Sequence, residues 1–141
     1  PKLVLGSSYT FDVGNGLTLL GEYHYSGFGA KDTSDATALF ARPEYEMRLL
    51  RGDTQILGRQ ALGVQASYPF NESLNGTLSI LTNPADGSGT VSPSIRWNLS
   101  RTTSLTVTGY APWGADSEDG VLQSENGGSP RRLFVQLGVY F

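Results

Sequence analysis

The chain has 141 residues, a formal net charge of -3 and no cysteine. This length predicts one domain at most, the negative charge argues against nucleic-acid binding, and the lack of cysteine excludes a disulfide scaffold or a thiolate metal site. Eighteen glycines, 11% aromatic residues and only 16% charged residues indicate a β-rich chain with many turns. No apolar run approaches the roughly 20 residues that a membrane-spanning helix needs.

Seven segments alternate apolar and polar residues with the period of two that is typical of β-strands. In chain order they are 3–12, 17–26, 61–70, 74–82, 90–98, 103–112 and 133–141. In the last of them Leu133, Val135 and Leu137 share one face, and Gln136 and Gly138 share the other. Pro93 costs the fifth segment a ladder hydrogen bond unless irregular pairing or a bulge accommodates it.

The connections between these segments are unequal in length. Residues 13–16 have the glycines and asparagine of a tight hairpin turn, and the connections 71–73 and 99–102 are also short. Between them lie longer loops at 27–59, 83–89 and 113–132, the first of which contains a helix-compatible stretch at 36–50. Loops as long as the first and the last are usually functional or disordered.

The final strand alternates and ends on Phe141, and in this it resembles the last strand of bacterial outer-membrane β-barrel proteins. The resemblance extends over nearly the whole chain, because those barrels also combine short turns with longer loops and place aromatic residues at strand ends. The predicted membrane-interface aromatics are Tyr9, Phe11, Tyr23, Tyr25, Tyr68, Phe70, Trp97, Trp113 and Phe141. The alternative explanation is that aromatic residues simply favour strands.

The resemblance implies an antiparallel up-and-down transmembrane β-barrel in the bacterial outer membrane, in contact with the lipid bilayer. It also implies recognition of the Phe141 strand by the barrel-assembly machinery. Soluble strands usually carry Lys and Glu on their wet face, but the polar face here carries mostly small hydroxyl and amide residues. We predict that this face lines a lumen, and the residues chosen for it are Glu22, His24, Gln65, Arg96 and Asn98.

The odd number of predicted strands, seven, indicates that the barrel contains more strands than this chain supplies. Bacterial single-chain barrels have an even number of strands, and an open sheet edge is costly in lipid. Residues 1–141 are therefore expected to form a single segment of seven or eight strands, whose edges pair with the remaining polypeptide of the same barrel or with another chain. An eighth strand could precede residue 1 or lie within 27–59.

The favoured function is a porin-like channel with a polar lumen for small solutes. Two alternatives stay open: a barrel that anchors a partner protein or uses its long loops for surface interactions, and a soluble β-barrel that binds a small ligand. No nucleophile motif or cofactor motif is present, so we expect neither an enzyme nor a cofactor. His24 and Glu22 lie one pleat apart and could contact each other. The acidic residues of the last loop do not match a calcium-binding loop and are expected to be solvated, namely Asp116, Glu118, Asp119 and Glu125.

Overall fold

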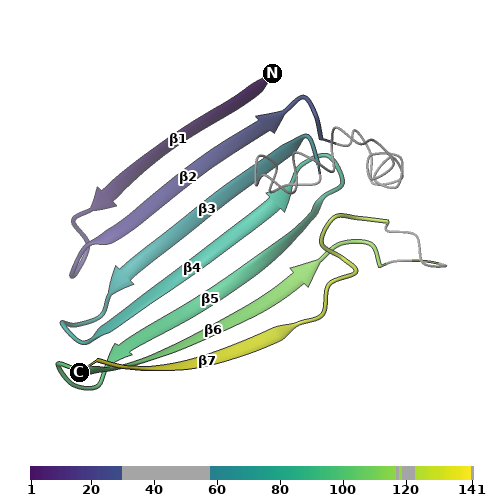
Figure 1. Cartoon of the computed structure of the whole chain (residues 1–141). Coiled ribbons are helices and arrows are strands. Elements are labelled where there is room, and N and C mark those ends of the chain that lie inside the picture. Colours follow the sequence, from purple (N-terminus) through teal and green to yellow (C-terminus); the bar gives the residue numbers. More distant parts are fainter. Residues whose placement is uncertain (30–57, 117, 119–122, 141) are drawn as a thin grey trace.

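A computed structural model describes residues 1–29, 58–116, 118 and 123–140, and these residues form one antiparallel sheet (Figure 1). The strands follow the sheet in sequence order. Their bounds are β1 Lys2–Phe11, β2 Leu17–Ser26, β3 Gln60–Pro69, β4 Leu74–Asn83, β5 Ser88–Asn98, β6 Thr103–Trp113 and β7 Arg132–Val139. Each bound lies within two residues of its prediction, so the all-β, up-and-down antiparallel organisation is confirmed.

The sheet is open. Within the described residues β1 pairs only with β2, and β7 pairs only with β6, because the sequential strand order places them at opposite edges. The described part of the chain therefore does not close into a barrel. The part of the predicted loop 27–59 that holds the helix-compatible stretch and the candidate eighth strand lies outside the described residues.

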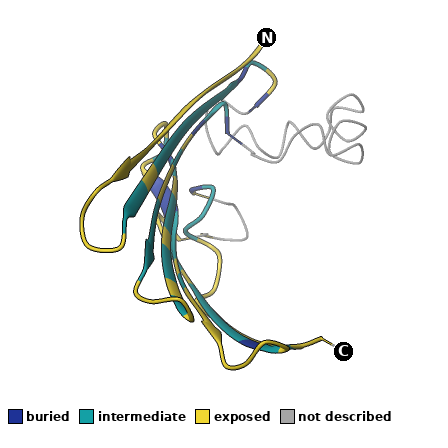
Figure 2. Cartoon of the chain, turned by 90° about the vertical axis from the view of Figure 1, so that its left-hand side faces the viewer, coloured by how far each residue is buried: buried dark blue, intermediate teal, exposed yellow. Residues whose placement is uncertain are grey.

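A hydrophobic core is missing from the described part of the chain. Ala61 is its one buried hydrophobic residue. Its other buried residues are the glycines Gly29, Gly58 and Gly89 and the polar residues Ser26, Asn83, Ser88, Ser104 and Ser124. A single layer of strands has no second layer against which to bury apolar side chains. Leu133, Val135 and Leu137 on β7 are 71%, 65% and 62% exposed. Figure 2 shows this single layer curved along its strand order.

The strand register gives each face of the sheet a uniform character. Leu5 pairs with Tyr23, Tyr23 pairs with Leu62, and Leu62 pairs with Thr82, so these side chains share one face. The odd-numbered positions of β1, β2, β5, β6 and β7 and the even-numbered positions of β3 and β4 form this face. The remaining positions form the second face, to which the predicted polar residues belong.

The connections alternate between two ends of the sheet (Figure 1). Residues 12–16, 70–73 and 99–102 connect strands at one end, which we call the turn end, and 27–59, 84–87 and 114–131 connect them at the other, the loop end. The predicted connection 83–89 is shorter than expected: Asn83 pairs with Ser88, so it is a tight turn of residues 84–87. Gly87, at φ 69°, donates its N–H to the Asn83 carbonyl at 2.9 Å.

Pro93 is accommodated by interrupted pairing rather than by a bulge. Between β5 and β6 the pairs Val91–Ala111 and Ser94–Thr108 keep one register, and no pair forms between them. The interruption lies opposite Gly109, which has no side chain to crowd the proline ring. Within the described residues, no helix combines the length and the hydropathy needed to cross a membrane.

Candidate functional site

The convex face of the sheet is apolar and uncharged. The loop segment 123–127 identifies the opposite, concave face, because Asn126 bonds Ser88 and Thr90 on it and the segment lies inside the curve (Figure 2). At the paired strand positions the convex face carries no Lys, Arg, Asp, Glu or His. Its central part is aliphatic, with side chains such as Leu5, Val64, Leu78, Ile95, Val107 and Val135.

Aromatic side chains border this aliphatic zone at both ends. At the turn end lie Tyr9, Phe11, Tyr68, Phe70 and Trp97, and at the loop end lie Tyr23, Tyr25 and Trp113. Two neighbouring pairs meet edge to face, Tyr9 with Phe11 at 4.8 Å and Tyr68 with Phe70 at 5.2 Å between ring centroids. Phe141 lies outside the described residues.

The distance between the two tryptophans gives the extent of the aliphatic zone along the strands. Trp113 pairs with Gly89, and Trp97 lies on the same strand as Gly89, eight residues further along. At about 3.3 Å per residue, the two positions lie roughly 26 Å apart along the strand. For a strand tilted by about 35–45°, this distance corresponds to a height of roughly 18–21 Å, which is within the apolar band of about 25 Å that outer-membrane barrels have.

The concave face holds every charged or histidine side chain that the paired strand positions carry: Lys2, Glu22, His24, Arg96 and Arg132. Most of its other side chains are small hydroxyls and amides. Some of these bond one another across strands, as Thr10 does with Thr18 at 3.0 Å and Ser94 with Thr108 at 2.9 Å between hydroxyl oxygens. Its bulkier apolar members are Val4, Leu20, Leu81, Tyr110 and Phe134.

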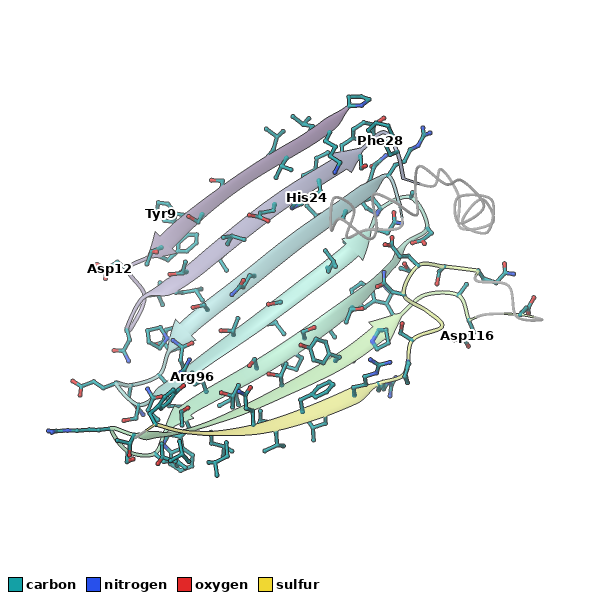
Figure 3. The ribbon with its side chains drawn as sticks, viewed as in Figure 1. Tyr9, Asp12, His24, Phe28, Arg96 and Asp116 are labelled. Carbon is teal, nitrogen blue, oxygen red and sulfur yellow. The ribbon has the colours of Figure 1, made fainter. Side chains whose placement is uncertain are left out.

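The five residues predicted to line a lumen all lie on the concave face, but the sheet separates them. Glu22 and His24 contact each other as expected, with Nε2 and Oε2 3.2 Å apart. Gln65 pairs with Leu20 and Ser79 in the middle of the sheet. The pairings place His24 level with Ser88, and Arg96 lies about 26 Å further along β5 at about 3.3 Å per residue (Figure 3).

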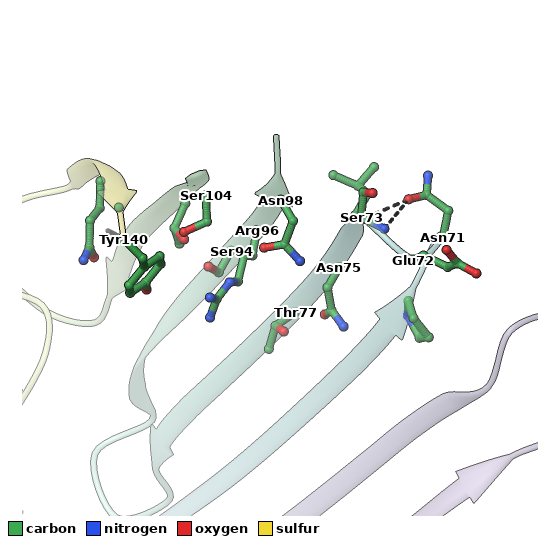
Figure 4. A pocket seen from close by; sticks show the side chains of 15 residues that line it. Asn71, Glu72, Ser73, Asn75, Thr77, Ser94, Arg96, Asn98, Ser104 and Tyr140 are labelled. Atoms are coloured by element: carbon green, nitrogen blue, oxygen red, sulfur yellow. Dashed lines mark hydrogen bonds between the residues drawn. The ribbon is translucent and has the colours of Figure 1, made fainter. Parts of the chain in front are cut away.

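Arg96 and Asn98 line a hollow of about 670 Å³ on the concave face near the turn end (Figure 4). The hollow extends from the end of β3 to β7 and includes the turn before β4. Its lining is polar, and the residues are Pro69, Asn71, Glu72, Ser73, Leu74, Asn75, Thr77, Ser94, Arg96, Asn98, Ser104, Thr106, Gln136, Gly138 and Tyr140. The sequence pattern placed most of these side chains on one face, but only the curvature of the sheet gathers them around one space.

At the loop end, the segment 123–127 is fixed to the sheet by hydrogen bonds. Glu125 Oε2 accepts from Asn83 Nδ2 at 2.7 Å, and the Glu125 N–H donates to Asp86 Oδ2 at 2.8 Å. Asn126 Nδ2 donates to Ser88 Oγ at 3.0 Å. The expectation of a solvated acidic loop is therefore wrong for Glu125, because its carboxylate satisfies a buried amide. Asp116 and Glu118 are exposed, and Asp119 lies outside the described residues.

Sequence reasoning missed the residues that hold this segment. Ser88 and Ser124 are 0% and 1% exposed, and Ser124 Oγ donates to the Ala115 carbonyl at 2.7 Å. The turn composition of 83–89 predicts a connection between strands, but it does not predict that the segment 123–127 binds there. The described part of the chain brings together no group of three or more His, Asp or Glu side chains that could hold a metal ion.

A comparison of the chain with family models, with curated proteins and with solved structures finds no match.

Proposed function

We propose that this chain forms part of the wall of a larger transmembrane β-barrel in the bacterial outer membrane, and that the barrel is a porin-like channel. The observation that carries the proposal is the uncharged convex face, which the described fold leaves without any covering layer. Soluble monomers rarely expose contiguous apolar patches larger than a few hundred Å². Lipid covers such a face without requiring a second layer of protein.

The direction of curvature supports this assignment over a soluble ligand-binding barrel. In a soluble barrel the apolar side chains fill the closed interior, and the polar side chains meet water outside. Here the polar side chains occupy the concave face, so closing the sheet in its present sense would enclose the polar residues. The apolar side chains would then face outwards, as in a transmembrane barrel.

The strand lengths and the aromatic borders also support a membrane location. Six of the seven strands have 10 or 11 residues, and a tilted transmembrane strand needs about 9–11. Tyrosine and tryptophan favour the interface between lipid and water because their rings are apolar and their N–H or O–H groups are polar. Trp113 donates its Nε1–H to the Gly87 carbonyl at 3.1 Å, which fixes one ring at the loop end.

The two open edges of the sheet imply that the proposed barrel contains further strands. Every backbone polar group within lipid must find a hydrogen-bond partner, and each group left unsatisfied costs several kcal/mol. The outward-facing backbone groups of β1 and β7 have no partner strand within the described residues. We therefore assign to each edge a pairing with more polypeptide, either from the same protein or from another chain.

A water-filled channel is the function that the polar concave face supports best. Its small hydroxyl and amide side chains leave space, as the hollow beside Arg96 shows, and its charged side chains interact with solutes. A scaffold for a partner protein is the second candidate. It is favoured by the loop segment 123–127, whose hydrogen bonds to β4, β5 and their turn give the loop end an ordered surface.

The first experiment extracts the native protein that contains this chain and compares gel mobility before and after boiling. A transmembrane barrel requires detergent for extraction and migrates differently once boiling unfolds it. The purified material is then inserted into planar lipid bilayers. Stepwise ion conductance is the expected result for a channel, whereas detergent-dependent, heat-modifiable protein without conductance supports the scaffold. A monomer that stays in solution without detergent contradicts the membrane assignment.

A further inference from the structure

Arg96 is the one cation among the residues that line the hollow on the concave face. It lies on β5, between β4 and β6, where it pairs with Asn75 on one side and Thr106 on the other. Both neighbours are uncharged. The rigid paired strands therefore fix the base of this side chain, and its guanidinium group extends into the space that the curved sheet leaves (Figure 4).

The guanidinium group of Arg96 has no carboxylate partner within the described residues. The one acidic residue of the hollow, Glu72, lies on the turn 70–73 at its rim and makes no ion pair with Arg96. The carboxylate of Glu22 contacts His24 instead, far along the sheet. The absence of such a partner leaves the planar fork of N–H donors available to a solute.

The neighbours of Arg96 are suited to complete an anion site. Asn75, Asn98 and Gln136 carry side-chain amides, and Thr106 carries a hydroxyl, all of which can donate hydrogen bonds. The hydroxyl of Ser94, which also lines the hollow, is bonded to that of Thr108. Thr106 pairs with Gln136, so these groups form a continuous row from β4 to β7. A guanidinium group bonds carboxylate and phosphate oxygens in pairs, and neutral donors beside it can bind the remaining oxygens.

We infer that the hollow around Arg96 is a weak binding site for a small oxyanion, a carboxylate or a phosphate, inside the turn-end mouth of the channel. This inference rests on the proposed channel function and gives it a substrate class. Weak binding suits a channel, because a solute must enter a site favourably and still leave it. Arg96 is exposed in the open sheet, which also favours weak rather than tight binding.

The acidic residues of the loop end do not cancel this charge. Asn75, which pairs with Arg96, lies eight residues from Asn83, the partner of Glu125, or roughly 26 Å at about 3.3 Å per residue. At physiological ionic strength the Debye length is about 8 Å. The carboxylates of the loop end are therefore screened from the hollow, and the charged residues that line it are Arg96 and Glu72.

The first test measures ion selectivity in planar bilayers that contain the complete protein. Arg96→Gln removes the charge in the hollow, and Arg101→Gln is the matched control, because Arg101 lies in the turn 99–102 at the same end but outside the lining. We expect Arg96→Gln to lower the anion-to-cation permeability ratio about two- to fivefold, and Arg101→Gln to leave it nearly unchanged. Arg96→Lys should retain the ratio. Equal ratios for the two glutamine variants would overturn the inference.

The second test detects binding without transport and uses inorganic phosphate as the probe. Phosphate is titrated into detergent-solubilised, arginine-labelled protein at constant ionic strength, and the Nε–Hε signals are followed by NMR. The Arg96 signal should shift and saturate at millimolar phosphate, whereas the Arg101 signal should not saturate, and Arg96→Lys should weaken the binding. Acetate in place of phosphate then shows which oxyanion the site prefers.

The two tests separate the failure of this inference from the failure of the proposed function. Saturable binding at Arg96 in a protein that conducts no ions would reject the channel and retain the anion site. Conductance with unchanged selectivity in Arg96→Gln and no saturable phosphate shift would retain the channel and reject the site.

Discussion

Gly89 and Trp113 lie opposite each other on the convex face, and the indole ring of Trp113 occupies the space that a Cβ atom on Gly89 would need. The Leu81 carbonyl oxygen also lies 2.6 Å from that Cβ position. The glycine thus allows the tryptophan to lie flat at the end of the aliphatic zone. Gly21, on the same face, has no atom within 4 Å of its Cβ position.

Replacement of the two glycines should therefore have opposite effects. Gly89→Val should lower the free energy of unfolding by about 1–3 kcal/mol, because the valine displaces the indole and strains the backbone. Gly21→Val should raise it slightly, since β-branched residues favour strands over glycine by up to about 1 kcal/mol. Urea unfolding of the protein in lipid vesicles measures both values. Equal losses would show that Trp113 does not contact Gly89.

Two neighbouring positions on β4 distinguish the two faces of the sheet. Leu78 lies at the centre of the convex face, and Ser79 follows it on the concave face. Leu78→Lys should cost about 2–4 kcal/mol in lipid, because it places a charge at the middle of the bilayer, whereas Ser79→Lys should be tolerated in a wet lumen. The measurement is the free energy of unfolding from vesicles. If Ser79→Lys were the costlier change, the faces would be reversed.

The bond between Glu125 and Asn83 should control the order of the segment 123–127. Glu125→Ala leaves the buried Asn83 amide without this acceptor, a loss of about 1–3 kcal/mol. Hydrogen exchange at the Gly127 N–H, which donates to Ser124 Oγ at 3.0 Å, should become about tenfold faster or more. Glu118→Ala, the control in the same loop, should change the exchange rate little. Unchanged exchange in Glu125→Ala would contradict the anchoring role.

Trp97 and Trp113 should lie at the two opposite lipid–water interfaces of the bilayer. We expect the fluorescence of each tryptophan, isolated by replacing the other with Phe, to be quenched more by lipids brominated near the headgroup than by lipids brominated near the chain end. The chain contains just these two tryptophans, so the difference between the two variants assigns each signal. Quenching by acrylamide in water without any effect of brominated lipids would contradict the lipid-facing position of both rings.

The strands and their faces could be predicted from the sequence because local features determine them. Alternation fixed the faces, and the glycines of 13–16 marked the first turn, where Gly14 and Gly16 have φ values of 59° and 96°. The docking of Glu125 could not be predicted, because its partner Asn83 lies 42 residues away and no local pattern encodes such a contact. The connection at 84–87 is shorter than its composition predicts, because Asn83 and Ser88 are turn-forming residues that nevertheless pair with each other.

The hollow beside Arg96 lay beyond prediction for a different reason. Periodicity placed Arg96 and Asn98 on the polar face, but a flat sheet with the same register would spread their neighbours over an open surface. The curvature brings side chains from five strands around one space, and it is a property of the whole sheet. A pattern within one strand therefore predicts which face a residue occupies and not which cavity it lines.

The strictly sequential strand order also determines how this sheet can assemble. Each strand pairs with its neighbour in the chain, and four of the six pairings join strands across short turns, so those parts of the sheet can form one hairpin at a time. Local pairings form quickly because they close short loops, whereas pairings between distant segments are slow. In a barrel that includes this chain, the joining of its outermost strands to the rest of the wall would be the slow, final event of folding.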